Sequence, residues 1–192
     1  MMRILGIDPG LRCTGWGVIA VDGGRLQHIA NGVIQPKPTL DDASRLQIIF
    51  DGLCEVITLH QPDQAAIEQI FVAKSAGSAL RLGMARGVGV LACGVNRLGV
   101  DEISARAVKK AVAGTGTADK KQIQDMVTRL LAVTAQNADA ADALAIAIAA
   151  SNEAGTAASV GVESGKEQAG NGLSAAIAEA LARDDAGNGG KT

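Results

Sequence analysis

The stretch Arg3–Gly10, RILGIDPG, places an aspartate at the end of an apolar run and directly before a Pro-Gly pair. The apolar residues predict a buried strand, and the Pro-Gly pair predicts a turn that ends it. A carboxylate at the end of a central strand is costly to bury unless it meets a cation or a metal ion. Asp8 is therefore either an ordinary turn former, since Asp, Pro and Gly are common turn residues, or part of a charged site.

Outward from this stretch, alternating and helical patterns predict a series of strands and helices. Three successive strands joined by short turns predict an antiparallel meander at the start of the chain. A long amphipathic helix, capped by Asp41 or Asp42, then leads to a short apolar strand that ends in a second carboxylate, Glu68. The predicted strands are 3–8, 14–21, 25–34, 63–68 and 100–104, and the predicted helices are 42–60, 75–98, 106–113, one that Thr117 caps, and one from 137 to 148.

The composition divides the 192 residues into a domain and an extension. Residues 1–151 contain 15 basic and 14 acidic side chains, whereas residues 152–192 contain 3 and 6 and are rich in Gly, Ala and Ser. We therefore expect a folded domain over 1–151 and a disordered acidic tail over 152–192. Three widely spaced cysteines in apolar contexts, and no predicted membrane span, favour a cytoplasmic protein with reduced thiols.

Glycine is frequent in the predicted helix 75–98. Each glycine weakens an isolated helix by roughly 1 kcal/mol relative to alanine. Glycine at this density indicates that something packs very close, either the sheet or a second subunit.

Basic residues concentrate in the segment Phe71–Arg129, which has ten Lys and Arg but only four Asp and Glu. This imbalance is typical of proteins that bind polyanions, although a solvated helix face gives the same count. Lys120 and Lys121 lie in the first turn of a predicted helix, where the helix dipole disfavours cations. A bound anion would explain the pair, and a solvated pair tolerated at small cost is the alternative.

Four acids at the ends of apolar elements suggest a metal site. Asp8 and Glu68 end predicted strands, and Asp139 and Asp142 share one helix face. A helix cap or a first-turn acid is the alternative for Asp139. If the two strands are neighbours and the helix packs across them, the four carboxylates converge. Oxygen ligands without His or Cys suit Mg²⁺ or Mn²⁺, and two such ions about 3.5 to 4 Å apart are typical of phosphodiester hydrolysis.

The motifs around these acids resemble the RuvC family of crossover junction endodeoxyribonucleases. The resemblance covers residues 3 to about 150. It implies an α/β, ribonuclease H-like fold with a mixed five-stranded sheet flanked by helices. The matching motifs are GIDPG at 6–10, TGWGVI at 14–19, IEQIF at 67–71 with the AKSAGSALRLGMARGV run after it, the stretch from Lys109 through GTGTADKKQIQ, and NADAADALAIAI at 137–148.

The resemblance also implies an activity. Members of this family resolve Holliday junctions in DNA recombination and repair by paired symmetric nicks, working as homodimers, with the RuvA–RuvB branch-migration complex as a further partner. Two Mg²⁺ ions per subunit, with Mn²⁺ as an alternative, are the implied cofactors. The family's catalytic and metal-holding acids carry over to Asp8, Glu68, Asp139 and Asp142.

DNA contacts carry over in the same way. Lys109 and Lys120 match family positions that contact DNA near the scissile phosphate, and Phe71 matches an aromatic that stacks on an unpaired base at the crossover. Phe71 follows the Glu68 strand and precedes Lys74, which we expect to contact DNA as well. Stacking is worth roughly 1 to 3 kcal/mol per base. A core phenylalanine is the alternative for Phe71.

Three other interpretations remain open at this point. The chain is alternatively another ribonuclease H-like nuclease, an actin-like nucleotide-binding protein, or a junction binder without catalysis. An actin-like phosphate loop also opens with a strand that ends in Asp-x-Gly, but the sequence has no second copy of this motif. The presence of all four acids disfavours a purely binding role.

Overall fold

The computed structural model describes residues 1–69 and 76–160. Within these ranges, three antiparallel strands and two parallel strands form one five-stranded sheet in the order β3-β2-β1-β4-β5. This mixed sheet confirms the predicted fold class and the meander at the start of the chain. The strands are β1 (Met2–Asp8), β2 (Thr14–Asp22), β3 (Arg25–Ile34), β4 (Gln64–Glu68) and β5 (Val100–Ile103).

Strand β1 lies at the centre because it is apolar on both faces. Its residues Ile4, Leu5 and Ile7 have no exposed surface, as is typical of a strand covered on both sides. Ile7 pairs with Ile67 in the parallel neighbour β4. Both strands therefore end at the same edge of the sheet, one with Asp8 and the other with Glu68.

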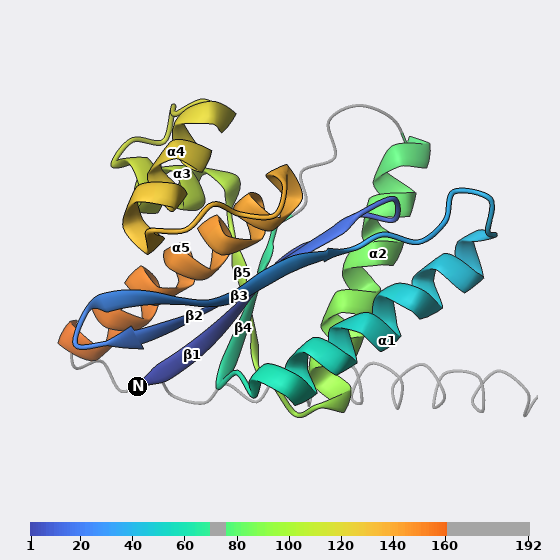
Figure 1. Ribbon diagram of the computed structural model, residues 1–192, viewed down its shortest axis with the longest axis horizontal. Coiled ribbons are helices and arrows are strands. Elements are labelled where there is room, and N and C mark those ends of the chain that lie inside the picture. The colour runs from blue at the N-terminus through green and yellow to red at the C-terminus, as the bar shows by residue number, and fades with distance from the viewer. Residues whose placement is uncertain (70–75, 161–192) are drawn as a thin grey trace, which may run out of the picture. The chain divides into compact units, whose positions relative to one another are not determined.

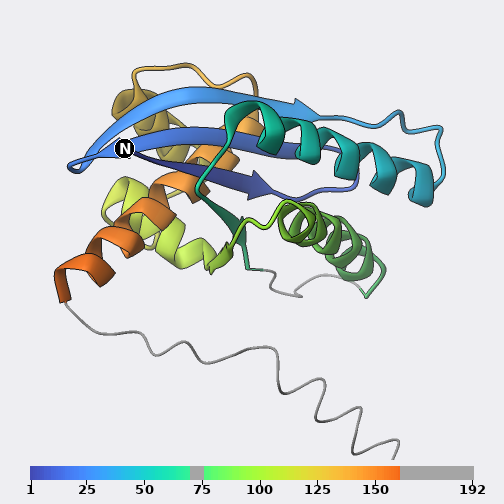
Figure 2. The ribbon, with the colours of Figure 1, turned by 90° about the horizontal axis from the view of Figure 1, so that it is seen from below.

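Helices cover both faces of the sheet (Figures 1 and 2). On one face, the first two helices pack in an apolar cluster that includes Leu5, Ile49 and Leu53. On the other face, the remaining three helices pack in a cluster that includes Ile4 and Ile146. The first pair is α1 (Asp42–His60) and α2 (Ala76–Val95), and the second group is α3 (Ala105–Ala113), α4 (Lys120–Leu131) and α5 (Ala138–Val160).

Helix α5 lies directly on the backbone of β1 and β2. A Cβ atom added to Gly6 or Gly15 would overlap the backbone carbonyl group of a helix residue, Ala143 for Gly6 and Asp139 for Gly15. Glycine is required at both positions because any side chain would push the helix away from the sheet.

The helix caps agree with the sequence at α1 and differ at α4. Asp41, one of the two predicted caps, accepts a 2.9 Å hydrogen bond from the backbone N–H of Ser44. Helix α4, however, is capped by Asp119, and the prediction of Thr117 was wrong. Asp119 and Gln122 bond to each other's backbone N–H groups at 2.8 and 2.9 Å, a reciprocal capping box that satisfies two donors at once.

Most glycines of α2 face open space rather than the sheet. Gly89 is the exception, since an added Cβ would lie 3.3 Å from Cδ1 of Ile67. Leu80 and Leu91 of the same helix are 67% and 56% exposed. Packing on the sheet therefore explains Gly89 only, among the glycines whose surroundings are described. The glycines with no atom within 4 Å of an added Cβ are Gly77, Gly83, Gly87 and Gly94.

The apolar composition of α2 bears on the expectation that the chain has no membrane span. Within residues 1–69 and 76–160, α2 is the one helix long and apolar enough to cross a membrane by length and composition, and 22% of its 18-residue apolar window is buried. No membrane span was predicted from the sequence. Length and composition alone are weak evidence for such a span.

The last helix passes the boundary that the composition predicted. Helix α5 continues to Val160, beyond residue 151. Ser151 is itself buried, and its hydroxyl donates a 2.7 Å hydrogen bond to the carbonyl of Ile148. Residues 161–192, the rest of the predicted tail, lie outside the described residues.

Candidate active site

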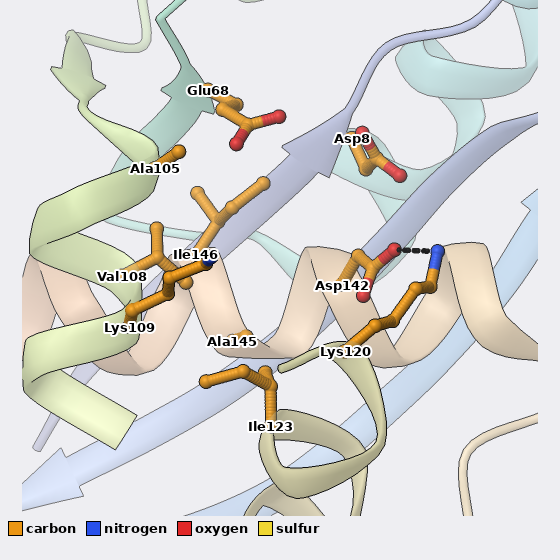
Figure 3. A pocket seen from close by; sticks show the side chains of 10 residues that line it. All are labelled: Asp8, Glu68, Ala105, Val108, Lys109, Lys120, Ile123, Asp142, Ala145 and Ile146. Atoms are coloured by element: carbon orange, nitrogen blue, oxygen red, sulfur yellow. Dashed lines mark ion pairs between the residues drawn. The ribbon is translucent and has the colours of Figure 1, made fainter. Parts of the chain in front are cut away.

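The four predicted acids gather at one edge of the sheet. Asp8 and Glu68 end the parallel neighbours β1 and β4, while Asp139 and Asp142 lie in the first two turns of α5. One carboxylate oxygen from each of Asp8, Asp139 and Asp142 lies within 4.8 Å of the other two. Glu68 lines the same pocket as Asp8 and Asp142 (Figure 3). Neighbouring strands and a helix that crosses them thus produce the convergence that the sequence predicted.

The pocket beside these acids has a volume of about 250 Å³ and combines charged with aliphatic side chains. Asp8, Glu68, Asp142 and Lys120 of α4 line it, and Lys109 of α3 lies among the aliphatic residues, next to Val108 (Figure 3). The aliphatic residues come from α3, α4 and α5. Their side chains lower the local dielectric and so strengthen the charge interactions in the pocket. The aliphatic residues are Ala105, Val108, Ile123, Ala145 and Ile146.

Crowding of the acids makes them hard to ionise together. Burial, followed by the charges of Asp142, Glu68 and Asp139, raises the pKa of Asp8 from 3.8 to about 7, although Lys120 opposes the shift. Burial and the charge of Asp142 also raise the pKa of Glu68. Like charges at this separation disfavour further ionisation unless a cation joins them. A bound cation would therefore reduce the electrostatic repulsion among these carboxylates.

Two lysines supply part of that compensation. The ammonium group of Lys120 lies 2.7 Å from a carboxylate oxygen of Asp142, and this hydrogen bond raises the pKa of Lys120 (Figure 3). The charge of Lys109 lowers the pKa of Glu68. Lys120 remains 61% exposed, so its ammonium group is also accessible to an incoming anion. Both lysines line the pocket beside the acids.

Residues that the sequence patterns did not assign to the site hold the acids in place. Arg45 of α1 donates a 2.9 Å hydrogen bond to the carbonyl of Leu11, which fixes the loop after Asp8. Asn137 caps α5 by accepting a 2.9 Å bond from the N–H of Ala140. The thiol of Cys13 is partly exposed and hydrogen-bonds Asp139. Burial and this bond raise the pKa of Cys13 to about 11.

Sequence signals for these supporting residues are weak. Asn137 is detectable as an Asn at the start of a predicted helix, because Asn is a preferred N-cap residue. Arg45 and Cys13 act over distances in the fold that no local pattern reports. Phe71 and Lys74, the other predicted DNA contacts, lie outside the described residues.

The donor set fits a hard divalent cation. Asp8, Asp139 and Asp142 present carboxylate oxygens close enough to share one ion, and among residues 1–69 and 76–160 no histidine lines the pocket. Oxygen-only sites of this kind favour Mg²⁺, Mn²⁺ or Ca²⁺ over zinc or copper. The raised pKa of Asp8 supports the same conclusion, because a cation would remove the repulsion that causes part of the shift.

Comparison with solved structures finds the same fold in junction resolvases. T. thermophilus RuvC in complex with a Holliday junction substrate is similar with a TM-score of 0.76 and 30% identity, covering 80% of this chain and 95% of that one. The yeast mitochondrial Holliday junction resolvase Ydc2 shares the fold with a TM-score of 0.57 at 12% identity, covering 77% of this chain and 78% of its own.

Sequence comparison gives a closer relationship. The RuvC protein of Caulobacter sp. (strain K31) is 52% identical over 152 residues, which cover 79% of this chain and 90% of the relative. That of Zymomonas mobilis subsp. mobilis is 51% identical over 148 residues, covering 77% and 89%. The profile of the family described as crossover junction endodeoxyribonuclease RuvC matches residues 4–150, a range that contains all four acids and both lysines of the pocket. On this evidence the chain belongs to the RuvC family of crossover junction endodeoxyribonucleases.

Proposed function

We propose that the chain resolves Holliday junctions in the cytoplasm by nicking two opposed strands symmetrically, as a homodimer that requires Mg²⁺. The convergence of four carboxylates from three separate elements, beside two lysines, carries this proposal. The T. thermophilus relative was solved with a Holliday junction substrate, which supports the same substrate here. An arrangement with both a cation site and a phosphate site fits phosphodiester hydrolysis.

The acids are the proposed metal ligands. Asp8, Asp139 and Asp142 would share one divalent ion, and Glu68 with Asp8 would hold a second. Mg²⁺ is the expected ion because the donors are carboxylate oxygens, and Mn²⁺ is the expected alternative. When bound, such ions supply Lewis-acid stabilisation of the charge that develops on the phosphate oxygens.

The chain's own residues then position the DNA. Lys109 and Lys120 are proposed to bind the phosphate beside the acids, because both ammonium groups line the pocket. Phe71 and Lys74, predicted to contact the crossover bases and backbone, belong to this proposal on sequence grounds alone.

A homodimer would explain the open glycines of α2. Five residues recur at helical spacing on one side of the helix, and its leucines are exposed while its glycines meet no atom. Two copies of this stripe can approach closely because glycine has no side chain. A two-fold enzyme also matches the two symmetric cuts of a four-way junction. The α2 stripe consists of Leu80, Gly83, Gly87, Leu91 and Gly94.

The RuvA–RuvB complex is the further partner that we propose from family resemblance. Co-purification with a junction as bait tests it: the chain should be retained by junction-bound RuvA–RuvB more strongly than by the junction alone. Equal retention on both baits would remove this partner from the proposal.

The decisive test of the activity compares DNA substrates. A mobile four-way junction, a duplex, a flap and an RNA–DNA hybrid are incubated with the chain, with and without Mg²⁺. We expect paired nicks in the junction only, and only with Mg²⁺. Preferential cutting of the hybrid or the flap would favour another ribonuclease H-like nuclease, and Mg²⁺-independent binding without cuts would leave a junction binder.

A further inference from the structure

Four positions beneath the start of α5 share one face of the sheet, and only one of them has a side chain. Asp8 pairs with Gly15 across β1 and β2, and Gly6 pairs with Gly17. Residues opposite each other, or two apart along a strand, point to the same face. The contacts of the three glycines show that this face meets α5. Asp8 is thus the one residue of the four that projects toward the helix.

The absence of side chains at the other three positions sets how deep the helix lies. Packed helices are usually held apart by the side chains between them, at about 8 to 10 Å between axes. Here the carbonyl of Asp139 lies where a Cβ of Gly15 would be. An aspartate side chain is short, so Asp8 reaches Asp139 and Asp142 only if the helix lies this low. Their oxygens come within 4.8 Å as a result.

The first turn of α5 cannot easily lift to make room for a side chain. The side chain of Asn137 accepts a 2.9 Å hydrogen bond from the backbone N–H of Ala140. The side chain of Asn31 on β3 accepts another, also of 2.9 Å, from the backbone N–H of Gln136. Ala140 is fully buried. A Cβ at position 15 would therefore have to displace this turn as a unit, and Asp139 would move with it.

We propose that Gly15 is a positioning residue for the metal-holding acids, because it sets the separation between Asp8 and Asp139. The inference rests on the proposed function, in which these two acids share an ion. Gly15 itself touches neither metal nor DNA in this role. Residues that orient metal ligands usually change metal affinity about 10- to 100-fold when they are altered.

Gly17 provides a matched control on the same strand and the same face. A Cβ there would lie 2.6 Å from Cδ2 and 2.7 Å from Cγ of Leu144, which are side-chain atoms, and the nearest backbone atom, the nitrogen of Leu144, would be 3.1 Å away. A side chain can yield by rotation, whereas the backbone carbonyl over Gly15 cannot move without its helix. Leu144 also lies in the apolar cluster rather than among the acids. Gly17→Ala should disturb the packing of α5 but leave the acids in place.

The experiment compares the parental chain, Gly15→Ala, Gly17→Ala and Asp8→Asn. Circular dichroism reports the fold, junction affinity in EDTA reports the lysine surface, and the rise in melting temperature with Mn²⁺ or Mg²⁺ reports metal binding without catalysis. Nicking is then measured against metal concentration.

For Gly15→Ala we expect a normal spectrum, unchanged junction affinity in EDTA, and an increase of about 10- to 100-fold in the half-saturating metal concentration by both readouts. Nicking should return at saturating Mn²⁺, and Gly17→Ala should keep the parental metal requirement.

Several outcomes would overturn the proposal. A folded Gly15→Ala with the parental metal requirement would do so, and so would an equal shift in Gly17→Ala. If Gly15→Ala is unfolded in buffer, the measurements are repeated in trimethylamine N-oxide, which favours the compact state. Failure to fold there would make Gly15 a determinant of folding only. The Asp8→Asn variant separates this inference from the proposed function. If that variant still nicks DNA, the proposal that Asp8 holds a catalytic metal ion fails, whatever Gly15→Ala shows.

Discussion

Glycines have opposite roles on the two faces of the sheet. On the α5 face, Gly6 and Gly15 lie against the backbone of a helix, and a single added carbon would collide with it. On the α2 side, Gly83, Gly87 and Gly94 meet no atom within 4 Å of the position a Cβ would take. The same residue type therefore lets the acids approach one another on one face and leaves a stripe uncovered on the other. The structural role of a glycine therefore depends on the atoms that face it and not on how frequent glycine is in the segment.

This difference predicts that substitutions on the α5 face affect chemistry and that those on the α2 stripe affect assembly. The two kinds of effect are separable because the acids lie on the α5 side and the α2 stripe lies outside the pocket. Variants on each face therefore test whether catalysis depends on the α5 face and assembly on the α2 stripe.

The largest expected effect is the loss of nicking when an acid is neutralised. Asp8→Asn and Asp142→Asn should lower the nicking rate by about a thousandfold or more, because several kcal/mol of charge stabilisation would be lost. Junction affinity in Ca²⁺ or EDTA should stay the same or increase, since negative charge beside the phosphate is removed. Single-turnover nicking and gel-shift titration measure the two quantities. If both variants fold and nick at near the parental rate, the acids on the α5 face are not the catalytic residues.

Next in size is the effect of a charge in the α2 stripe. Leu91→Glu would bury an unpaired carboxylate if two copies of α2 meet there, which costs several kcal/mol and should give a monomer at micromolar concentration. Light scattering measures the mass. Glu55→Gln on α1, an exposed change outside the stripe, is the control. A parental chain that is already monomeric at high concentration, with nicking intact, would remove the dimer from the proposal.

The pH dependence of stability should come from the α5 face. The pKa of Asp8 is raised to about 7 in the metal-free fold, so between about pH 4 and pH 7 the native state keeps a proton that the unfolded chain releases. Stability in EDTA is therefore highest at the low end of this window and falls, by the order of a few kcal/mol, as the pH rises through 7. Thermal unfolding at pH 5 and pH 8 measures this. Asp8→Asn should flatten the dependence, and a chain more stable at pH 8 would contradict the raised pKa.

The lysines of the pocket should produce a smaller, salt-dependent effect. Lys109→Ala and Lys120→Ala should weaken junction binding and lower the slope of log affinity against log salt by about 0.9 for each phosphate that is no longer neutralised. Titrations at several salt concentrations give the slope. Lys37→Ala, outside the pocket, should leave it unchanged. Parental slopes with normal nicking would place both lysines on a solvated surface instead.

The smallest effect belongs to a glycine in the α2 stripe. Gly87→Ala fills open space in one protomer and should stabilise the helix by about 1 kcal/mol. The same methyl group should weaken the dimer, since it separates the two crossing helices. Urea unfolding and analytical ultracentrifugation measure the two effects. If the dimer is unchanged while the chain becomes more stable, the stripe's glycines do not lie at a dimer contact.

Much of the site was predictable because its acids carry local signals. Asp8 and Glu68 are conspicuous at the ends of apolar strands, and the spacing of Asp139 and Asp142 places them on one helix face. Lys120 was identified as an unfavourable cation at a helix start, and the structure places it against Asp142. The prediction of Thr117 as the cap failed because Asp119 forms a bond in both directions with Gln122, which outweighs a single threonine contact.

The supporting contacts were out of reach of local patterns. Arg45 meets Leu11 across 34 residues, and Asn31 meets Gln136 across 105. No local pattern indicated that α5 continues past residue 151, since a Gly- and Ser-containing stretch is typical of tails.

The sequence by itself determined the order of strands and helices, the four acids, the basic block and the family. Each of these depends on residues that are close in the sequence, or on the order of the motifs along the chain. Only the tertiary structure decided how far apart the acids lie, which glycines face a helix and which face open space, and that Asp142 pairs with Lys120. The separation of the acids depends on the depth at which α5 packs, which is set by backbone contacts between segments more than a hundred residues apart.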